Sequence, residues 1–112
     1  MSDKETEFRR FCCLKADSSL SAERQLTKSL IGLSEEVGEL FSAFKKHIFY
    51  RAPLDKANVV EELGDIYHYF TLILVANNLT IDDIVSSNVD KLNKRYPVGY
   101  TDAAAKERLD KK

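Results

Sequence analysis

Residues 26–48 read LTKSLIGLSEEVGELFSAFKKHI and decide the fold class of this 112-residue chain. Apolar side chains recur in this stretch at every third or fourth position. They are Leu26, Leu30, Leu33, Val37, Leu40, Phe44 and Ile48. This is the spacing of an α-helix that buries one face, so the stretch predicts one long amphipathic helix that begins after Ser21 and runs to about Ile48.

Helix signals continue on both sides of this stretch. A capping-box pattern at Ser2 predicts a first helix, and residues 17–19 predict a break after it. Farther along the chain, Pro53 disfavours helix at the residue before it. We therefore expect a connection at residues 49–54 and a third helix over residues 55–77.

A fourth helix follows the third. Thr80 and Asp83 form another capping box, which predicts a helix from residue 81 to about residue 96, and Pro97 and Gly99 end it. No stretch alternates apolar and polar residues as a half-buried strand would. The chain therefore predicts an all-α fold, a bundle of four to five helices.

The size of the chain limits its core. At this length we expect one domain over residues 1–100, followed by a charged tail at residues 101–112. Such a domain buries only a modest core. Nearly every position from Ile66 to Ala76 is apolar, which suits a helix that is buried on several sides. A second copy could cover the additional side, so we expect a homodimer or a homotetramer.

Charge, hydropathy and cysteine usage exclude several kinds of partner. Seventeen Lys and Arg against eighteen Asp and Glu give no bulk field that attracts a nucleic acid polymer or an anionic membrane. No apolar run approaches the roughly 20 residues of a membrane span, and the N-terminus is charged, so a cytoplasmic protein is expected. Cys12 and Cys13 are adjacent and could pair only with strain, which predicts buried or half-buried free thiols rather than a redox or metal role.

Two pairs of carboxylates stand on the second and third predicted helices. Glu36 and Glu39 are three residues apart, as are Glu62 and Asp65, so each pair shares a helix face beside the apolar one. Antiparallel packing could gather all four, and such a cluster is repulsive unless a cation neutralises it. Mg²⁺ prefers carboxylate and water oxygens, so the pattern predicts a Mg²⁺ site, with Mn²⁺ as an alternative ion. For each residue alone, a solvated helix face is the simpler interpretation.

Two glycines and a histidine lie close to these carboxylates in the sequence. Gly38 and Gly64 directly precede Glu39 and Asp65, although a glycine inside a helix costs about 1 kcal/mol relative to alanine. Close packing of a neighbouring segment is one explanation. His68 follows Asp65 by three residues, but the helical wheel turns it away from the carboxylates, which favours a surface or interface histidine.

A polar stripe on the fourth predicted helix could contact phosphates. Asn88, Lys91 and Arg95 follow three-and-four spacing, and a guanidinium can bind a phosphate through two hydrogen bonds. Tyr69, one turn beyond Asp65, could donate its hydroxyl to a phosphate or ribose oxygen. The simpler interpretation is a solvated face whose cations complement the helix dipole, and a tyrosine that packs.

The acidic motifs also resemble those of a known family. Residues 35–39 (EEVGE) and 62–65 (ELGD) are similar to the EExxE and ExxD motifs of MazG-like pyrophosphohydrolases, members of the all-α NTP pyrophosphatase superfamily. The resemblance extends from about residue 30 to residue 100. It implies that Glu35 orients or deprotonates the attacking water and that nucleotide contacts lie near Lys46. The Mg²⁺ ligands that it implies are Glu36, Glu39, Glu62 and Asp65.

The same resemblance implies the reaction. An NTP or dNTP would be cleaved between its α- and β-phosphates to a monophosphate and pyrophosphate, in a house-cleaning or pool-balancing role. One alternative is a related pyrophosphohydrolase that acts on diphosphate-containing or phosphoribosyl nucleotides. Another is a carboxylate di-iron bundle, for which Asp65 and His68 are the only approximation to the expected motif. The last is a helical interaction module without catalysis.

Overall fold

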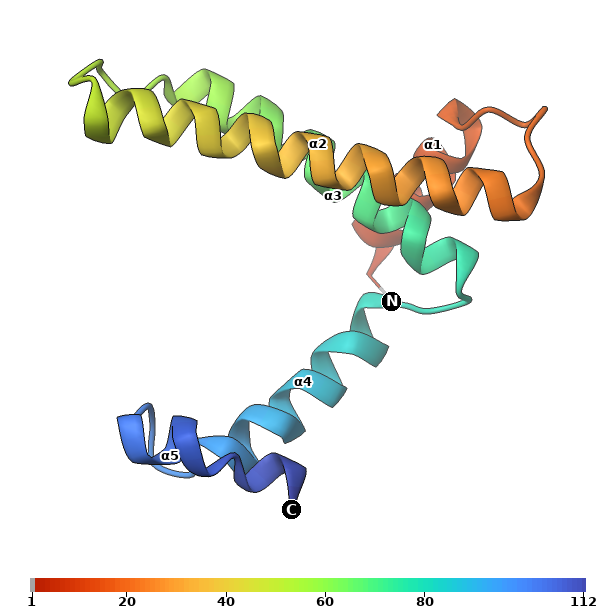
Figure 1. Cartoon of the computed structure of the whole chain (residues 1–112). Coiled ribbons are helices and arrows are strands. Elements are labelled where there is room, and N and C mark those ends of the chain that lie inside the picture. Colours follow the sequence, from red (N-terminus) through yellow and green to blue (C-terminus); the bar gives the residue numbers. More distant parts are fainter. Residues whose placement is uncertain (1) are drawn as a thin grey trace. The chain divides into compact units, whose positions relative to one another are not determined.

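The computed structural model describes residues 2–112. Within these residues the chain forms helices and no β-strand, so the prediction of an all-α fold is confirmed. The chain divides into two compact units, residues 2–78 and residues 79–112. The helices in order are α1 (Asp3–Lys15), α2 (Ala22–Phe49), α3 (Lys56–Ala76), α4 (Ile81–Arg95), α5 (Asp102–Glu107) and the short 3₁₀ helix η1 (Leu109–Lys111) (Figure 1).

In the first unit, α2 and α3 form a long antiparallel hairpin, and α1 packs against α3 (Figure 1). Polar side chains cap these helices. The hydroxyl of Ser2 accepts a hydrogen bond from the backbone N–H of Glu5, and that of Ser21 accepts one from the N–H of Arg24. The caps give partners to backbone groups that have none inside their own helices. The boundaries predicted for α2 and α3 agree closely with those observed.

The apolar face predicted on α2 is only partly buried within the chain. Its residues Leu30, Phe44 and Ile48 stay exposed. The helix α3 lies against a neighbouring edge of α2, where Ser29 is buried and Gly32 lies under the ring of Tyr69. A single chain therefore leaves an apolar surface on the hairpin, of the kind that proteins usually cover.

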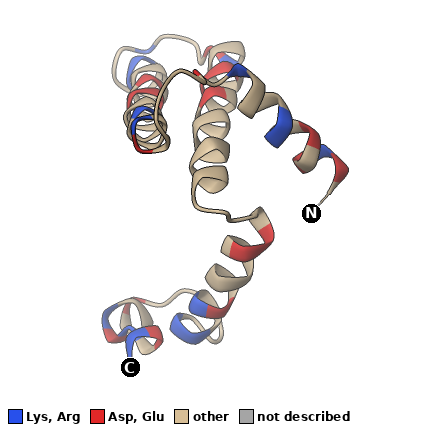
Figure 2. Ribbon diagram, turned by 90° about the vertical axis from the view of Figure 1, so that its right-hand side faces the viewer, with Lys and Arg blue, Asp and Glu red and all other residues tan. Residues whose placement is uncertain are grey.

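The core of this unit is small. Its fully or nearly buried residues are Cys12, Ser29, Glu62, Thr71 and Leu74. The C-terminal half of α3 carries no charged residue (Figure 2). Even so, no helix in residues 2–112 meets both the length and the hydropathy that a membrane crossing requires.

The second unit is built on α4. Thr80 and Asp83 form the predicted capping box, in which each side chain accepts a hydrogen bond from the backbone N–H of the other residue. The tail predicted at residues 101–112 contains α5 and η1. Asp110 in η1 forms an ion pair with Arg95 at the end of α4, which holds η1 on α4. The domain boundary predicted before this tail stays a prediction.

Candidate metal centre and adjacent recess

Three of the predicted carboxylates meet where α2 packs on α3. Glu62 and Asp65 stand one turn apart on α3, and Glu36 reaches them from α2. One carboxylate oxygen from each residue lies within 4.8 Å of the other two. The hairpin thus brings together acids from two helices that are joined by a loop and lie far apart in the sequence.

Burial makes this cluster electrostatically unfavourable. Glu62 is only 8% exposed, and its Oε2 atom has no hydrogen-bond partner in the described part of the chain. The pKa of Glu36 is raised to about 7, first by a hydrogen bond to Glu62 that only protonated Glu36 can donate. Partial burial and the charges of Asp65, Glu62 and Glu39 raise it further. The cluster is therefore stable only with a proton or a cation between its oxygens.

These residues fit a hard divalent cation. Carboxylate oxygens are the ligands that such ions prefer, and a cation would neutralise the Glu62 oxygen that the described residues leave without a partner. Glu39, the fourth predicted ligand, is exposed on α2 and lies outside this three-residue cluster. Its charge still contributes to the raised pKa of Glu36. A ligand role for Glu39 stays a prediction.

Close packing does not explain the two glycines of the acidic motifs. A Cβ atom built on Gly38 or Gly64 would meet no described atom within 4 Å, so that explanation is wrong within this chain. Gly32, one turn before Glu36, does have a close neighbour. A Cβ atom there would lie 2.5 Å from Cζ of Tyr69. The ring of Tyr69 therefore lies directly on the α2 backbone, one turn from the carboxylate cluster.

Glu35, the residue before Glu36 of the cluster, lines a groove of the first unit. This groove has a volume of about 790 Å³ and follows the N-terminal half of α2, where Glu35, Gly32, Lys28 and Tyr69 are among the residues that line it. Glu35 is exposed there and does not belong to the three-residue cluster. Its carboxylate is therefore available to a molecule that binds in the groove.

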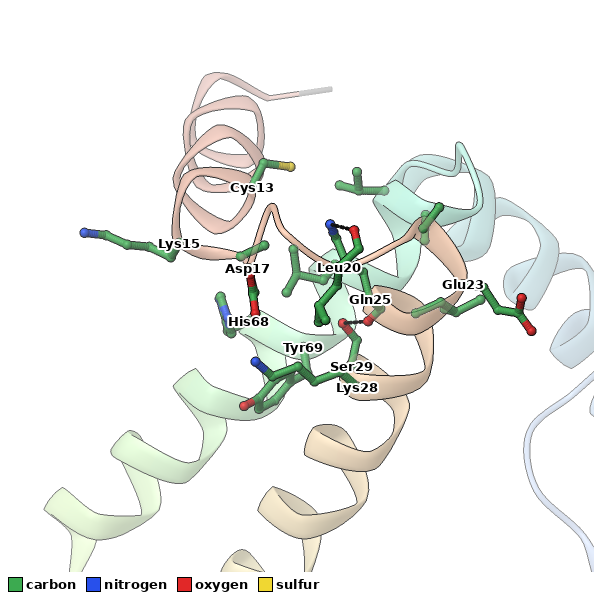
Figure 3. Close-up of a pocket in the computed structure, with 16 residues that line it drawn as sticks. Cys13, Lys15, Asp17, Leu20, Glu23, Gln25, Lys28, Ser29, His68 and Tyr69 are labelled. Atoms are coloured by element: carbon green, nitrogen blue, oxygen red, sulfur yellow. Dashed lines mark hydrogen bonds between the residues drawn. The ribbon is translucent and has the colours of Figure 1, made fainter.

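A more enclosed recess of about 510 Å³ adjoins the groove, between α1, α2 and α3 (Figure 3). Tyr69 and Lys28 line both cavities. Ser29 from α2 and His68 from α3 add polar atoms to the recess. Its apolar wall includes Leu20, Leu26, Leu72, Val75 and Ala76. A recess of this size, mainly apolar with a few polar groups, is typical of a small-molecule site.

The structure places His68 in this recess rather than on an open surface. The residue is half-buried, and its Nδ1 atom lies 3.2 Å from Sγ of Cys12 in α1. Both thiols are free as predicted, and Cys12 is fully buried, but the predicted burial is wrong for Cys13, which is exposed on α1. Sequence reasoning missed His68 and Lys28 as recess residues, because only the packing of α1 on the hairpin creates the recess.

The other predicted phosphate contacts line neither cavity. Lys46 is exposed in the last turn of α2, and Asn88 and Lys91 are exposed on α4 of the second unit. Arg95 makes two hydrogen bonds to Asp110, at 2.6 and 2.9 Å. This pairing raises the pKa of Arg95 and lowers that of Asp110 to about 2. Phosphate contact by these residues stays a prediction, and for Arg95 the Nε and one Nη are already bound to Asp110.

Comparison with known proteins agrees with the acidic motifs. A family model described as the MazG nucleotide pyrophosphohydrolase domain matches residues 24–100, more than half of the chain. The match includes all of α3 and the part of α2 that carries Glu36. Searches of curated proteins and of solved structures gave no match. The chain therefore belongs to the MazG family of nucleotide pyrophosphohydrolases, enzymes that hydrolyse phosphoanhydride bonds.

Proposed function

We propose that this protein is a Mg²⁺-dependent nucleoside triphosphate pyrophosphohydrolase. It cleaves the α–β phosphoanhydride of an NTP or dNTP and releases a nucleoside monophosphate and pyrophosphate. The observation that supports this most directly is the cluster of Glu36, Glu62 and Asp65, in which Glu62 is buried with an unpartnered oxygen among the described residues. Acids held this close favour a bound cation, and a polyphosphate is a natural ligand for the same cation.

The carboxylates of α2 and α3 hold the metal. Glu36, Glu62 and Asp65 supply the first ligand oxygens, with Glu39 as a fourth ligand. When bound, Mg²⁺ offsets the charge of the phosphates and lowers the pKa of a nearby water. The packing of α2 on α3 holds the three acids together before the substrate arrives, which reduces the reorganisation that the reaction requires.

Glu35 acts as the general base. Its exposed carboxylate lines the groove, next in sequence to Glu36 of the cluster. A carboxylate in this position can hold a water molecule and accept its proton as the oxygen attacks phosphorus. The new bond to phosphorus forms while the bond to the leaving pyrophosphate breaks, and the proton of the water passes to Glu35.

The recess receives the base of the nucleotide. Tyr69 lines both the groove and the recess, so a nucleotide with its phosphates beside the carboxylates passes this ring to place its base against the apolar wall. Lys28 also lines both cavities, and its ammonium group complements the charge of the phosphates. Lys46, Asn88, Lys91 and Arg95 remain predicted phosphate contacts.

A second copy of the chain completes the assembly. The exposed apolar residues of α2, among them Leu30 and Phe44, form a face that α3 of the same chain leaves open. Homo-oligomers with closed symmetry are the usual means of covering such a face. We infer a homodimer or a homotetramer in which another hairpin packs there.

Release of pyrophosphate tests the proposal. The protein is assayed on NTPs, dNTPs, and diphosphate-containing and phosphoribosyl nucleotides, with Mg²⁺ and with EDTA. Asp65→Asn removes a metal ligand and should lower the activity by roughly 100-fold or more. Glu61→Gln changes an exposed acid on the same helix outside the cluster, so it should keep wild-type activity. Equal activity of the two variants, or release that does not depend on metal, would contradict the proposal.

A further inference from the structure

A hydrogen-bonded pair outside the carboxylate cluster joins α1 to α3. Nδ1 of His68 lies 3.2 Å from Sγ of Cys12. Cys12 is fully buried, whereas the His68 ring lines the recess between α1, α2 and α3 (Figure 3). The pair thus connects the interior of the protein to the wall of the cavity proposed to hold the base.

The burial of the thiol allows Cys12 to act as the donor in this hydrogen bond. Burial, and to a smaller extent the neighbouring Cys13, raises the pKa of Cys12 to about 11, so the thiol keeps its proton at neutral pH. In residues 2–112 the partner of Sγ is Nδ1 of His68, and the tautomer of the imidazole decides which atom donates. A protonated thiol can donate to an unprotonated Nδ1. A neutral imidazole that accepts at one nitrogen carries its proton on the other. With the thiol as the donor, which is the arrangement that the proposal below requires, Cys12 holds His68 in the tautomer with N–H at Nε2.

This N–H is an unused donor in the recess. Nε2 of His68 has no hydrogen-bond partner among the described residues. Two polar side chains of α2 that line the same recess are engaged near their own helix, since the Ser29 hydroxyl donates to the carbonyl of Gln25 and the Gln25 amide donates to the carbonyl of Leu20. Tyr69 lines both cavities, whereas His68 lines the recess and not the groove. A nucleotide whose phosphates lie in the groove would therefore meet His68 only with the part that enters the recess, which is the base in the proposed function.

We propose that His68 is a specificity-determining residue of the nucleotide site, with Cys12 as its positioning residue. The proposal rests on the proposed function. Nε2–H donates a hydrogen bond to a carbonyl oxygen at C4 of a pyrimidine or C6 of a purine. Uracil, thymine, guanine and hypoxanthine carry this oxygen, whereas cytosine and adenine carry an amino group, which is also a donor. Two facing donors leave each other unsatisfied, so amino bases are rejected by roughly 10- to 100-fold.

Paired substrates together with a His68 variant test this contact. The ratio of kcat/KM is measured for dUTP against dCTP and for ITP against ATP, because the members of each pair share the sugar and the triphosphate and differ in the 4- or 6-substituent and in the protonation of the adjacent ring nitrogen. The wild-type protein should prefer the carbonyl member by roughly 10-fold or more, mainly through KM. His68→Phe should bring both ratios close to one. Tyr67→Phe changes the neighbouring residue, which is not among those lining the recess, and should keep the wild-type ratios. Unchanged ratios in His68→Phe would overturn the proposal.

Variants of Cys12 separate positioning from folding. Cys12→Ser keeps a donor towards Nδ1 and should keep the base preference. Cys12→Ala removes the donor and should lower the preference, whereas mere destabilisation would lower the activity on both bases equally. Nitrogen-15 spectra of the full, metal-free chain report the tautomer directly, and His68 should be protonated at Nε2. Protonation at Nδ1 would overturn the proposal.

The two proposals fail in different ways. If no nucleotide releases pyrophosphate, the proposed function fails, but uridine and cytidine monophosphates can still be titrated into the metal-free protein. Uridine monophosphate should then shift the Nε2 resonance of His68 at a lower concentration than cytidine monophosphate does. An equal response to both, or no response at His68, would overturn the role of His68 even in a protein that releases pyrophosphate.

Discussion

Protonated Glu36 on α2 can donate a hydrogen bond to Glu62 on α3, and this contact is the main reason that the pKa of Glu36 rises from an ordinary value near 4.5 to about 7. Between these two values the folded protein holds a proton that the unfolded chain has released. The stability of the metal-free protein should therefore fall as the pH rises through this window. In EDTA, Tm should be lower at pH 8 than at pH 5. Mg²⁺ should reverse part of the loss, because it replaces the proton between the carboxylates.

Glu36→Gln is the control for this pH dependence. Its neutral amide avoids the repulsion from Glu62 and Asp65 at every pH. The metal-free variant should therefore lose less stability than the wild type between pH 5 and pH 8, and Mg²⁺ should stabilise it less. Comparison of the two proteins removes the contribution of the other titrating groups. The same pH dependence in both would show that Glu36 is not the group responsible.

The contact between Gly32 and Tyr69 gives a second prediction. In Gly32→Ala the new Cβ would lie 2.5 Å from Cζ of Tyr69, so the ring must move away from α2. Alanine favours the helix by about 1 kcal/mol, which offsets the cost of moving a half-buried ring. The free energy of unfolding in urea should therefore change by less than about 1 kcal/mol. The KM for the nucleotide should rise, because Tyr69 is displaced from the wall of both cavities.

Gly38→Ala is the matched control on the same helix. Its new Cβ would meet no described atom within 4 Å, so the variant should gain about 0.5–1 kcal/mol in the free energy of unfolding. A loss of stability here would show that a second copy of the chain fills the space beside Gly38. An unchanged KM in Gly32→Ala would contradict the placement of Tyr69 against the nucleotide.

The ion pair between Asp110 and Arg95 gives a third prediction. Asp110→Asn removes the charge that holds η1 on α4, so backbone amides of residues 109–111 should exchange hydrogen faster, while those of α3 keep their protection. Arg95 lowers the pKa of Asp110 from about 3.8 to about 2. The ion pair therefore stabilises this unit fully at pH values above the ordinary aspartate pKa of about 3.8. The stabilisation is lost as the pH falls towards 2.

Hydrogen exchange measured by mass spectrometry checks this third prediction. Asp90→Asn is the matched control, since Asp90 is an exposed acid on α4. It should leave the exchange of residues 109–111 at the wild-type rate. Equal protection of these residues in Asp110→Asn and Asp90→Asn would mean that packing, and not the ion pair, holds η1 in place.

The helices could be predicted from the sequence because their signals are local. The caps at Ser2 and Thr80 lie within four residues of the groups they bind, and the apolar period of α2 shows within a few turns. The acidic cluster was predictable for a related reason, since each pair of carboxylates shares a turn of one helix. Only the hairpin between the two helices had to be assumed.

What the sequence could not predict depends on how helices pack side by side. Periodicity places an apolar face on α2, but it does not say whether α3 or a second copy covers that face. The contact of Gly32 with Tyr69 follows from the register between α2 and α3. The contact of Cys12 with His68 joins residues 56 positions apart. No local pattern encodes either contact, so the recess was missed.

The uncovered face of α2 gives the last prediction. Phe41 is 69% exposed in the single chain and stands one residue from Leu40 of the apolar face. If a second hairpin covers this face, Phe41→Glu places a charge in an apolar interface, which is costly.

Sedimentation at micromolar concentration should then show a dimer or tetramer for the wild type and a smaller species for Phe41→Glu. Ser42→Glu adds the same charge at an exposed position about 100° away on the helix and should keep the wild-type assembly. A monomeric wild type, or equal dissociation of both variants, would mean that the hairpin does not pair through this face.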